Sequence, residues 1–194
     1  FIALLCGIPL VIKGGLPIIF IGLISILMGY SYTSGPFPLA YLGLGDLFVV
    51  FFFGLVAVSG MYYLHTGLVN LDCAVLGLQI GLLSTVLIAI NNLRDCEGDQ
   101  KVGKRTLAVR FGKKFVRWEI LFLLILPFFA GSYWYLARGM FFAFLMPLFV
   151  FPLAVRISYL IFVTEPSPVY NKYLGLSALV HLLFGALFSI GVLL

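Results

Sequence analysis

The stretch LDCAVLGLQIGLLSTVLIAI, residues 71–90, contains twenty residues with one charged side chain, Asp72. A helix of about 20 apolar residues is long enough to cross roughly 30 Å of bilayer hydrocarbon. The stretch therefore predicts a membrane-spanning helix. It is followed directly by NNLRDCEGDQKVGKRT, residues 91–106, which carries seven charged side chains in a chain with 12 Lys or Arg and 7 Asp or Glu. The sequence thus joins an apolar span to a dense polar segment.

The composition indicates that the rest of the chain is also built for a membrane. Of its 194 residues, 63% are hydrophobic and 10% are charged, against about 25% charged residues in soluble domains. Five more stretches are long and apolar enough to span: residues 16–32, 47–64, 118–137, 139–162 and 173–194. A seventh apolar segment, residues 1–12, is too short. We predict an all-α, multi-pass transmembrane helix bundle, with residues 1–194 forming a single domain in a lipid bilayer.

The first apolar segment starts without Met, inside an apolar run and with no charged residue before it. A secretory signal peptide would have a basic region and a small-residue cleavage site, and the sequence has neither. We expect residues 1–12 to be the end of a helix whose beginning is missing, so that the domain is truncated at its N-terminus.

Basic residues are concentrated in one connection between spans. Eight of the twelve Lys and Arg residues lie between Arg94 and Arg117. Such a concentration is typical of a cytoplasmic loop, so the net charge of +5 indicates how the chain is oriented in its membrane and does not indicate a nucleic-acid partner. We expect the active face on the cytoplasmic side. The three cysteines form no disulfide framework, and the oligomeric state stays open.

The polar segment has the side chains of a metal site. If the preceding helix continues into it, Asn91, Asp95 and Asp99 follow one another at i, i+4 on one face, with Asn92 beside them. Two like charges on one helix face are mildly destabilising without a counter-charge, which favours a bound cation. Hard oxygen donors suit Mg²⁺ or Ca²⁺ rather than zinc.

Basic residues at positions 101, 104 and 105 follow the aspartates, with a glycine between them that lets the chain turn. Their side chains supply hydrogen-bond donors for phosphate oxygens. Together with the carboxylates they predict a metal-diphosphate site at the membrane surface. The alternative on the same residues is a solvated cytoplasmic loop in which Asp95 and Asp99 pair with Arg or Lys.

The longer stretch NNLRDCEGDQKVGKRTLAVRFG, residues 91–112, closely resembles the second aspartate-rich motif of the UbiA superfamily of intramembrane aromatic prenyltransferases. YTSGPFPLAYLGLGDLFVVFFFG (32–54) and GMYYLHTG (60–67) resemble a loop and the helix after it in one branch of that superfamily. This branch prenylates 1,4-dihydroxy-2-naphthoate in menaquinone biosynthesis. The resemblance covers most of the chain.

The resemblance implies a bundle of nine transmembrane helices around a cavity that opens toward the cytoplasm. The seven apolar segments would then be helices three to nine. The first aspartate-rich motif of the family, at the end of its second helix, does not occur in this sequence. The chain alone would therefore lack about half of the family's metal ligands, and we expect it to be inactive by itself.

The resemblance also implies roles for individual residues. Asp95 and Asp99 match the metal-binding aspartates, which hold Mg²⁺ against a polyprenyl diphosphate and so serve catalysis. The implied substrate-binding residues are Asn91, Asn92, Arg94, Lys104, Arg105, Tyr32 and Gly35. No Lys or Arg lies between Ser31 and Leu47, so a basic residue that some relatives have in this loop is missing here.

The implied reaction is the transfer of a polyprenyl group. Mg²⁺ and basic side chains neutralise the charge that grows on the leaving diphosphate, and the allylic C–O bond ionises. The electron-rich ring of dihydroxynaphthoate attacks the cation and loses CO₂, which gives demethylmenaquinone. Apolar walls keep out the water that would quench the cation.

The same residues are compatible with two other functions. A sister enzyme would use another acceptor, such as 4-hydroxybenzoate or homogentisate. An ion-coupled transporter would use Asp95 and Asp99 as its ion site, but transport sites tend to lie near the bilayer midplane, which favours an enzyme. Asp46, just before a span, is expected to be a helix N-terminal cap or a partner of the helix dipole.

Overall fold

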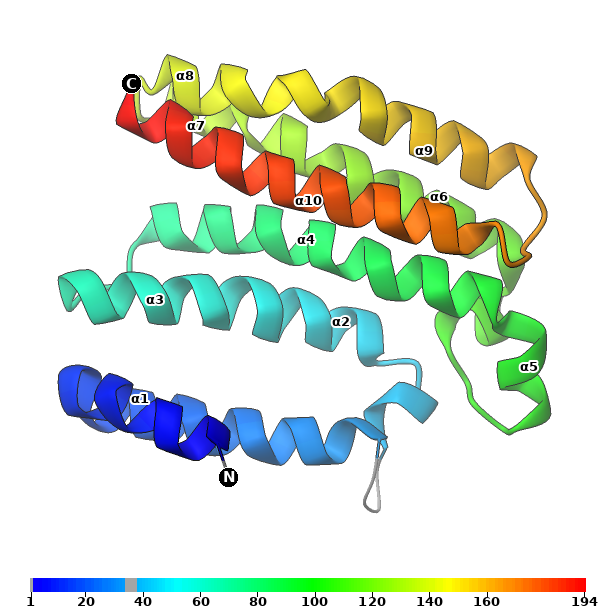
Figure 1. Ribbon diagram of the computed structural model, residues 1–194, viewed down its shortest axis with the longest axis horizontal. Coiled ribbons are helices and arrows are strands. Elements are labelled where there is room, and N and C mark those ends of the chain that lie inside the picture. The colour runs from blue at the N-terminus through cyan, green and yellow to red at the C-terminus, as the bar shows by residue number, and fades with distance from the viewer. Residues whose placement is uncertain (1, 34–37) are drawn as a thin grey trace.

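The computed structural model describes residues 2–33 and 38–194, and within these ranges every regular element is a helix. Figure 1 shows the long helices lying side by side as a bundle. The elements in chain order are α1 (Ile2–Thr33), η1 (Leu39–Tyr41), α2 (Gly45–Val49), η2 (Val50–Val56), α3 (Ala57–Thr66), α4 (Leu71–Arg94), α5 (Cys96–Lys101), α6 (Leu107–Ala130), α7 (Ser132–Leu136), α8 (Phe141–Leu145), η3 (Met146–Val150), α9 (Phe151–Val163) and α10 (Tyr170–Leu193).

Among residues 2–33 and 38–194, six helices are long and apolar enough to cross a membrane, which confirms the predicted multi-pass bundle. The six are Leu4–Tyr32, Gly45–Thr66, Leu71–Arg94, Leu107–Leu136, Phe141–Val163 and Tyr170–Leu193. The chain is therefore an integral membrane protein. The span expected from residue 118 lies in α6, which begins at Leu107 and breaks at Gly112 (φ 84°, ψ 166°), so the apolar part of the span belongs to the helical stretch after this break. The first turns of α6 carry charge but are amphipathic, with Ala108 and Val116 buried while Lys114 is exposed.

The two apolar segments predicted at residues 1–12 and 16–32 both belong to α1. Gly15 separates them, with φ 64° and ψ −150°, a backbone conformation that L side chains rarely adopt. The blue ribbon doubles back at this point in Figure 1. The short first segment is thus a separate limb that lies beside the second.

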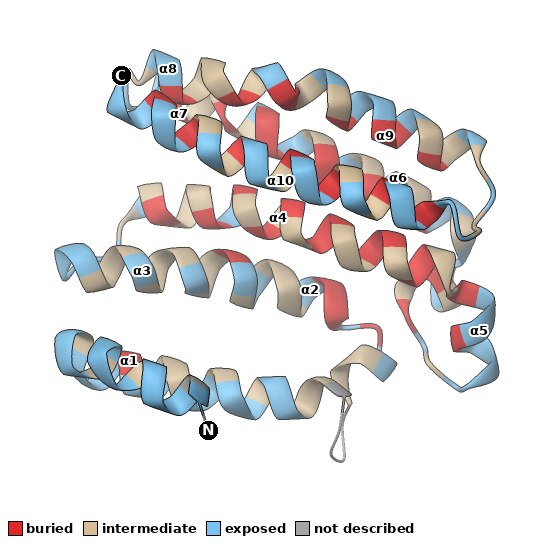
Figure 2. Cartoon of the chain, viewed as in Figure 1, coloured by how far each residue is buried: buried red, intermediate tan, exposed pale blue. Residues whose placement is uncertain are grey.

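Helix α4 is the centre of the packed part of the bundle. The main hydrophobic cluster joins α4 to α6, α9 and α10, and Ile90, Ile120, Ile157 and Val180 in it are each fully buried. Over the most apolar stretch of each helix, 56% of α4 is buried against 6% of α1. Figure 2 shows this contrast as red bands along α4, α6, α9 and α10 and mostly pale blue on α1.

Three glycines bring the second span, Gly45–Thr66, into backbone contact with α4. A Cβ atom on Gly81 would lie 2.5 Å from the carbonyl oxygen of Val50, and one on Gly54 would lie 2.3 Å from that of Gly77. Small residues of this kind let membrane helices approach closely. The contact fixes η2, and with it α2, against the middle of α4.

The predicted polar face requires the helix over residues 71–90 to continue straight as far as Asp99. The structure shows a bend instead. Helix α4 ends at Arg94, and Asp95, with φ −95° and ψ 5°, separates it from α5. The bend turns Cys96 and Asp99 inward, and Cys96 joins the hydrophobic cluster next to α6.

Candidate functional site

A polar cavity lies where α1, the segment around η1 and the end of α4 meet. Its volume is about 270 Å³. The lining residues are Tyr32, Ala40, Tyr41, Gly43, Gly45, Asp46, Ile88, Asn91, Asn92, Lys104 and Thr106. Carboxylate, amide, phenol and ammonium groups therefore share one small cavity at the end of the bundle that also carries α5 (Figure 1).

Arg94 organises the end of α4 by donating hydrogen bonds to four oxygen atoms of three residues. Its Nε donates to Oδ1 of Asp95 at 2.7 Å, and its Nη2 donates to Oδ2 of the same carboxylate at 2.6 Å. Nη2 also donates to Oδ1 of Asn91 at 2.7 Å, and Nη1 donates to Oδ1 of Asn171 in α10. The hydrogen bonds from the Arg94 guanidinium hold the pKa of the Asp95 carboxyl below its ordinary value. Asp95 therefore lies in an ion pair with Arg94, as in the solvated-loop alternative.

Asp99 lies in a more enclosed position than Asp95. Its side chain is 11% exposed, against 41% for Asp95. Oδ1 accepts a hydrogen bond from Nζ of Lys104 at 3.2 Å, whereas buried Oδ2 has no partner within residues 2–33 and 38–194. Gly103, with φ 77°, turns the chain so that Lys104 returns to Asp99. Asp99 thus keeps one buried oxygen that no described residue engages.

Lys104 connects Asp99 to the polar cavity. It lines the cavity, and its Nζ lies 5.9 Å from the ring centroid of Tyr41, at a distance typical of cation–π contacts. Arg105 contributes through its backbone, where its N–H donates to the Tyr41 carbonyl at 3.0 Å. The basic segment and the 38–46 segment are therefore held together as one wall.

Gly43 is required for that wall. It has φ 71°, and a Cβ atom there would lie 2.5 Å from the carbonyl oxygen of Arg105 and 3.3 Å from Cδ of Arg110. Only glycine fits this approach. Arg110, to which the sequence analysis assigned no role, is thereby placed beside the cavity wall.

Asp46 is the cavity residue that sequence reasoning missed. It was expected to cap a helix or to be a partner of the helix dipole. The N-cap position of α2 is Leu44, and the described part of the chain shows no side-chain capping bond there, but Asp46 does lie in the first turn of α2, where a dipole partner is expected. Asp46 is 6% exposed, and its Oδ1 lacks a hydrogen-bond partner among the residues described. The sequence contains one signal for this residue. Asp46 lies in a segment without Lys or Arg, so its carboxylate has no counter-charge nearby in the chain.

The other predicted site residues are divided between two places. Tyr32, Asn91, Asn92 and Lys104 line the cavity together. The Tyr32 hydroxyl would be 3.1 Å from a Cβ atom on Gly45, so the missing side chain there leaves room for the phenol. Arg94 and Asp95 pair with each other beside this group. The predicted residue Gly35 lies outside the described residues.

The donor set fits a magnesium ion only in part. Asp46 and Asp99 each have a buried carboxylate oxygen that is not engaged by a described residue, and two amides lie nearby. No group of three or more His, Cys, Asp or Glu side chains within the described ranges could enclose a metal ion. Mg²⁺ commonly takes one or two carboxylates and fills its other positions with water and phosphate oxygens. The residues present fit that mode of binding and not a complete protein cage.

An apolar groove adjoins the polar cavity. Its volume is about 560 Å³, and Tyr32, Phe48 and Phe52 are among its lining residues, so that Tyr32 borders both spaces. A second apolar groove of about 620 Å³ shares Ser25, Phe52 and Ala57 with the first and runs on along α1 and α3. The grooves give the polar cavity an apolar extension between α1 and the second span.

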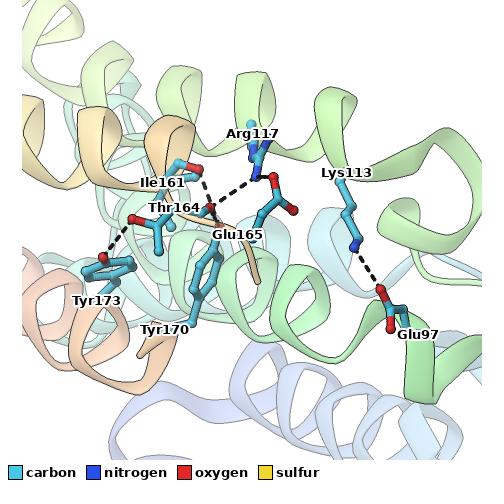
Figure 3. Close-up of polar contacts among 8 residues, drawn as sticks. All are labelled: Glu97, Lys113, Arg117, Ile161, Thr164, Glu165, Tyr170 and Tyr173. Carbon is cyan, nitrogen blue, oxygen red and sulfur yellow. Dashed lines mark hydrogen bonds and ion pairs between the residues drawn. The ribbon is translucent and has the colours of Figure 1, made fainter. Parts of the chain in front are cut away.

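Polar contacts outside the cavity hold its frame, as Figure 3 shows. Nζ of Lys113 in α6 donates to Oε1 of Glu97 in α5 at 2.9 Å. Nη2 of Arg117 donates to the Thr164 carbonyl at 3.1 Å and to Oε1 of Glu165 at 2.8 Å. The hydrogen bond from Arg117 lowers the pKa of the Glu165 carboxyl. These contacts tie α5 and the connection between α9 and α10 to α6.

The sequence is similar to that of known prenyltransferases. A sequence profile of the UbiA prenyltransferase family matches residues 1–172. The 1,4-dihydroxy-2-naphthoate octaprenyltransferase of Haemophilus influenzae is 35% identical over 176 residues, which cover 89% of this chain and 56% of that protein. The protein of the same name from Escherichia coli is 41% identical over 93 residues, covering 48% of this chain and 30% of that protein.

A human protein named UbiA prenyltransferase domain-containing protein 1 is 29% identical over 165 residues, which cover 85% of this chain and 47% of that protein. The chain thus spans about half the length of the curated relatives that it matches over most of its own sequence.

Proposed function

The chain belongs to the UbiA prenyltransferase family, and from this premise we propose that the protein transfers a polyprenyl group from a polyprenyl diphosphate to 1,4-dihydroxy-2-naphthoate. The transfer would release diphosphate and CO₂ and give the reduced form of demethylmenaquinone. The observation that carries the proposal is the polar cavity with its apolar extension at Tyr32. A substrate with a charged head and a long apolar tail needs both spaces side by side.

The diphosphate would lie at the polar end. Lys104 supplies a positive charge there, and Asn91 and Asn92 supply amide groups for phosphate oxygens and water. Asp99, and in the family's pattern Asp95, would hold Mg²⁺, which supplies charge neutralisation for the leaving diphosphate when it is bound. Arg94 donates one hydrogen bond to each oxygen of Asp95, so metal binding by Asp95 would use the lone pairs that remain on these oxygens.

The polyprenyl tail would occupy the apolar grooves. Phe48 and Phe52 line the first groove, and the second continues it for another 620 Å³. Apolar walls keep water away from the allylic carbon, where water would otherwise take the place of the aromatic acceptor and give a free prenyl alcohol. Tyr32, which borders both the polar cavity and the apolar groove, then marks the region where the polyprenyl tail meets the diphosphate head.

The polar cavity would face the cytoplasm in a bacterial inner membrane. Eight basic residues between Arg94 and Arg117 lie at that end of the bundle, and basic loops favour the cytoplasmic side. The names of the relatives favour dihydroxynaphthoate over 4-hydroxybenzoate or homogentisate as acceptor.

The test is an assay of the full-length parent protein in membranes. It would receive an octaprenyl diphosphate, Mg²⁺ and, separately, dihydroxynaphthoate, 4-hydroxybenzoate or homogentisate. We expect a prenylated naphthoquinol with the first acceptor only. Transfer to one of the others alone would overturn the acceptor assignment, and transfer to none would overturn the proposed function.

A further inference from the structure

Arg94 makes side-chain hydrogen bonds to two helices. A guanidinium carries one N–H on Nε and two on each Nη. Nε and Nη2 of Arg94 donate to the two carboxylate oxygens of Asp95, and Nη2 also donates to Oδ1 of Asn91. Nη1 donates to Oδ1 of Asn171, which lies 77 residues further along the chain in the first turn of α10. Arg94 therefore joins two residues at the end of α4 to a different helix.

The contacts of Arg94 differ in what they fix. Asn91 and Asp95 belong to the same end of α4 as Arg94, so their hydrogen bonds orient its side chain relative to α4 alone. The bidentate pair with the Asp95 carboxylate holds one edge of the guanidinium. Asn171 accepts from Nη1, away from that edge. Among the described residues, it is the one side-chain contact that fixes the guanidinium relative to α10.

The first turn of α10 is itself held in place. Tyr170 is fully buried, and its hydroxyl donates to the Thr164 carbonyl at 2.9 Å. Tyr173 is buried as well, and its hydroxyl lies 3.1 Å from Oγ1 of Thr164. Nη2 of Arg117 donates to the same Thr164 carbonyl from α6, as Figure 3 shows. The two buried tyrosines flank Asn171, so its backbone has a fixed place next to the end of α4.

Asn91 links Arg94 to the polar cavity. It lines the cavity, and its Oδ1 accepts from Nη2 of Arg94 at 2.7 Å. A guanidinium can only donate, so Arg94 determines which end of the Asn91 amide is the oxygen. The Nδ2 group of Asn91, which donates to no described residue, is then left to donate to a phosphate oxygen. The orientation of Arg94 therefore sets the donor that Asn91 offers to the cavity.

We propose that Asn171 is a positioning residue for the diphosphate. By accepting a hydrogen bond from Arg94, it holds the guanidinium in the orientation that fixes the Asn91 amide. The inference rests on the proposed function, because it takes the polar cavity as the place of the diphosphate. Asn171 is not among the described residues that line the cavity, so it acts through Arg94. The family resemblance implied site residues only between Tyr32 and Arg105.

The test replaces Asn171 with leucine in the full-length parent protein, because leucine keeps the size of the side chain and removes the acceptor. Residues that orient a ligating side chain contribute roughly 10- to 100-fold to affinity or activity, and we expect the lower end because Asn171 acts through Arg94. KM for octaprenyl diphosphate and Kd for inorganic diphosphate, both measured with Mg²⁺, should therefore each rise roughly tenfold. KM for dihydroxynaphthoate should stay unchanged.

Two further variants show that the lost acceptor causes this effect. Asn171→Gln keeps an amide oxygen and should recover part of the affinity for inorganic diphosphate. Lys172→Gln changes the next residue of the same turn, which is also exposed, and should match the wild type. Because the Asn171 side chain is exposed, the melting temperature of Asn171→Leu in detergent should stay at the wild-type value. If Asn171→Leu does not accumulate in membranes, Asn171→Ala takes its place, because truncating an exposed side chain leaves no cavity.

A double-mutant cycle with Arg94→Lys separates positioning from folding. Lysine keeps the positive charge but lacks the planar fork that contacts Asp95, Asn91 and Asn171 together. If Asn171 acts through Arg94, Asn171→Leu should cause no further loss of diphosphate binding in the Arg94→Lys background. An equal further loss in that background, or wild-type constants for Asn171→Leu alone, would overturn the positioning role.

Failure of the proposed function would give a different result. If the wild-type protein binds inorganic diphosphate but does not prenylate dihydroxynaphthoate, the function proposed above fails, and the Kd comparison still decides the role of Asn171. If the wild-type protein does not bind inorganic diphosphate, both proposals are overturned.

Discussion

The two halves of the bundle differ in how they bury their side chains. Helices α4, α6, α9 and α10 share one hydrophobic cluster, whereas α1 and the span formed by α2, η2 and α3 have only 6% of their most apolar stretches buried. The polar cavity lies at the seam, with Tyr32 and Asp46 from the open half and Asn91, Asn92 and Lys104 from the packed half. The packed half supplies rigidity to the diphosphate end, and the open half supplies apolar space.

The most severe way to break this arrangement is to remove a carboxylate that the packed half brings to the seam. We expect Asp99→Ala to lower prenyl transfer by the full-length parent roughly 10³-fold, because Lys104 loses its partner and the diphosphate end loses an oxygen donor. Glu97→Gln is the matched control in the same helix, and its turnover should stay at the wild-type level. Wild-type turnover in Asp99→Ala would show that this carboxylate serves only a structural ion pair with Lys104.

A second variant acts on the contact between the halves. Gly81→Val would place a side chain 2.5 Å from the Val50 carbonyl, where the neighbour is backbone and cannot move aside. Overpacking of this kind costs about 1–3 kcal/mol, so we expect a lower melting temperature in detergent together with lower turnover.

Gly98→Ala is the control for that variant, because a Cβ atom there would meet no described atom within 4 Å. It should melt at the wild-type temperature or slightly above. Equal melting temperatures for Gly81→Val and the wild type would show that the close contact does not hold the halves together.

A third variant narrows the apolar space of the open half. Ala57 borders both apolar grooves, so Ala57→Trp would block the passage between them. We expect KM for octaprenyl diphosphate to rise roughly tenfold, equivalent to about 1.4 kcal/mol of lost binding, while KM for geranyl diphosphate stays unchanged. Leu68→Trp, at an exposed turn, is the control. An equal change in KM for both diphosphates would show that the polyprenyl tail does not bind in these grooves.

The smallest effect is expected at the edge of the packed half, where Arg117 pairs with Glu165 (Figure 3). Because the pair lowers the pKa of Glu165, the folded protein binds this proton less readily than the unfolded chain. The pair therefore stabilises the fold above the ordinary glutamate pKa of about 4.3, and the stabilisation disappears as the pH falls through the lowered pKa. Glu165→Gln should lower the melting temperature slightly at pH 7 and not at pH 3. A pH-independent difference would assign the effect to packing.

The fold was predictable where apolar length alone decides the structure. The stretch at residues 71–90 predicts a span, and α4 covers it, because no other element satisfies the backbone polar groups of a single apolar segment in lipid. The beginning of α6 was not predictable in this way, since its first turns carry basic residues on one face and bury apolar residues on the other. Length and mean hydropathy do not detect such a turn.

The site was predictable in composition but not in arrangement. The segment 91–106 provides Asn91, Asn92 and Lys104 to the cavity, as its polar side chains suggested. Two features depend on tertiary contacts that local spacing cannot contain. The bend at Asp95 places Cys96 against the hydrophobic cluster next to α6, and the burial of Asp46 arises only when the second span packs on α4.

The claim that both halves build one diphosphate site can be tested by photoaffinity labelling of the full-length parent. The probe is a polyprenyl diphosphate analogue with a diazirine next to the diphosphate, added with Mg²⁺ and followed by mass spectrometry of the labelled peptides. We predict label both in residues 38–46 and in residues 91–106, and loss of both signals when unlabelled octaprenyl diphosphate competes. Label confined to one of these segments, or label at the opposite end of the bundle around Asp72 and Arg138, would contradict the account.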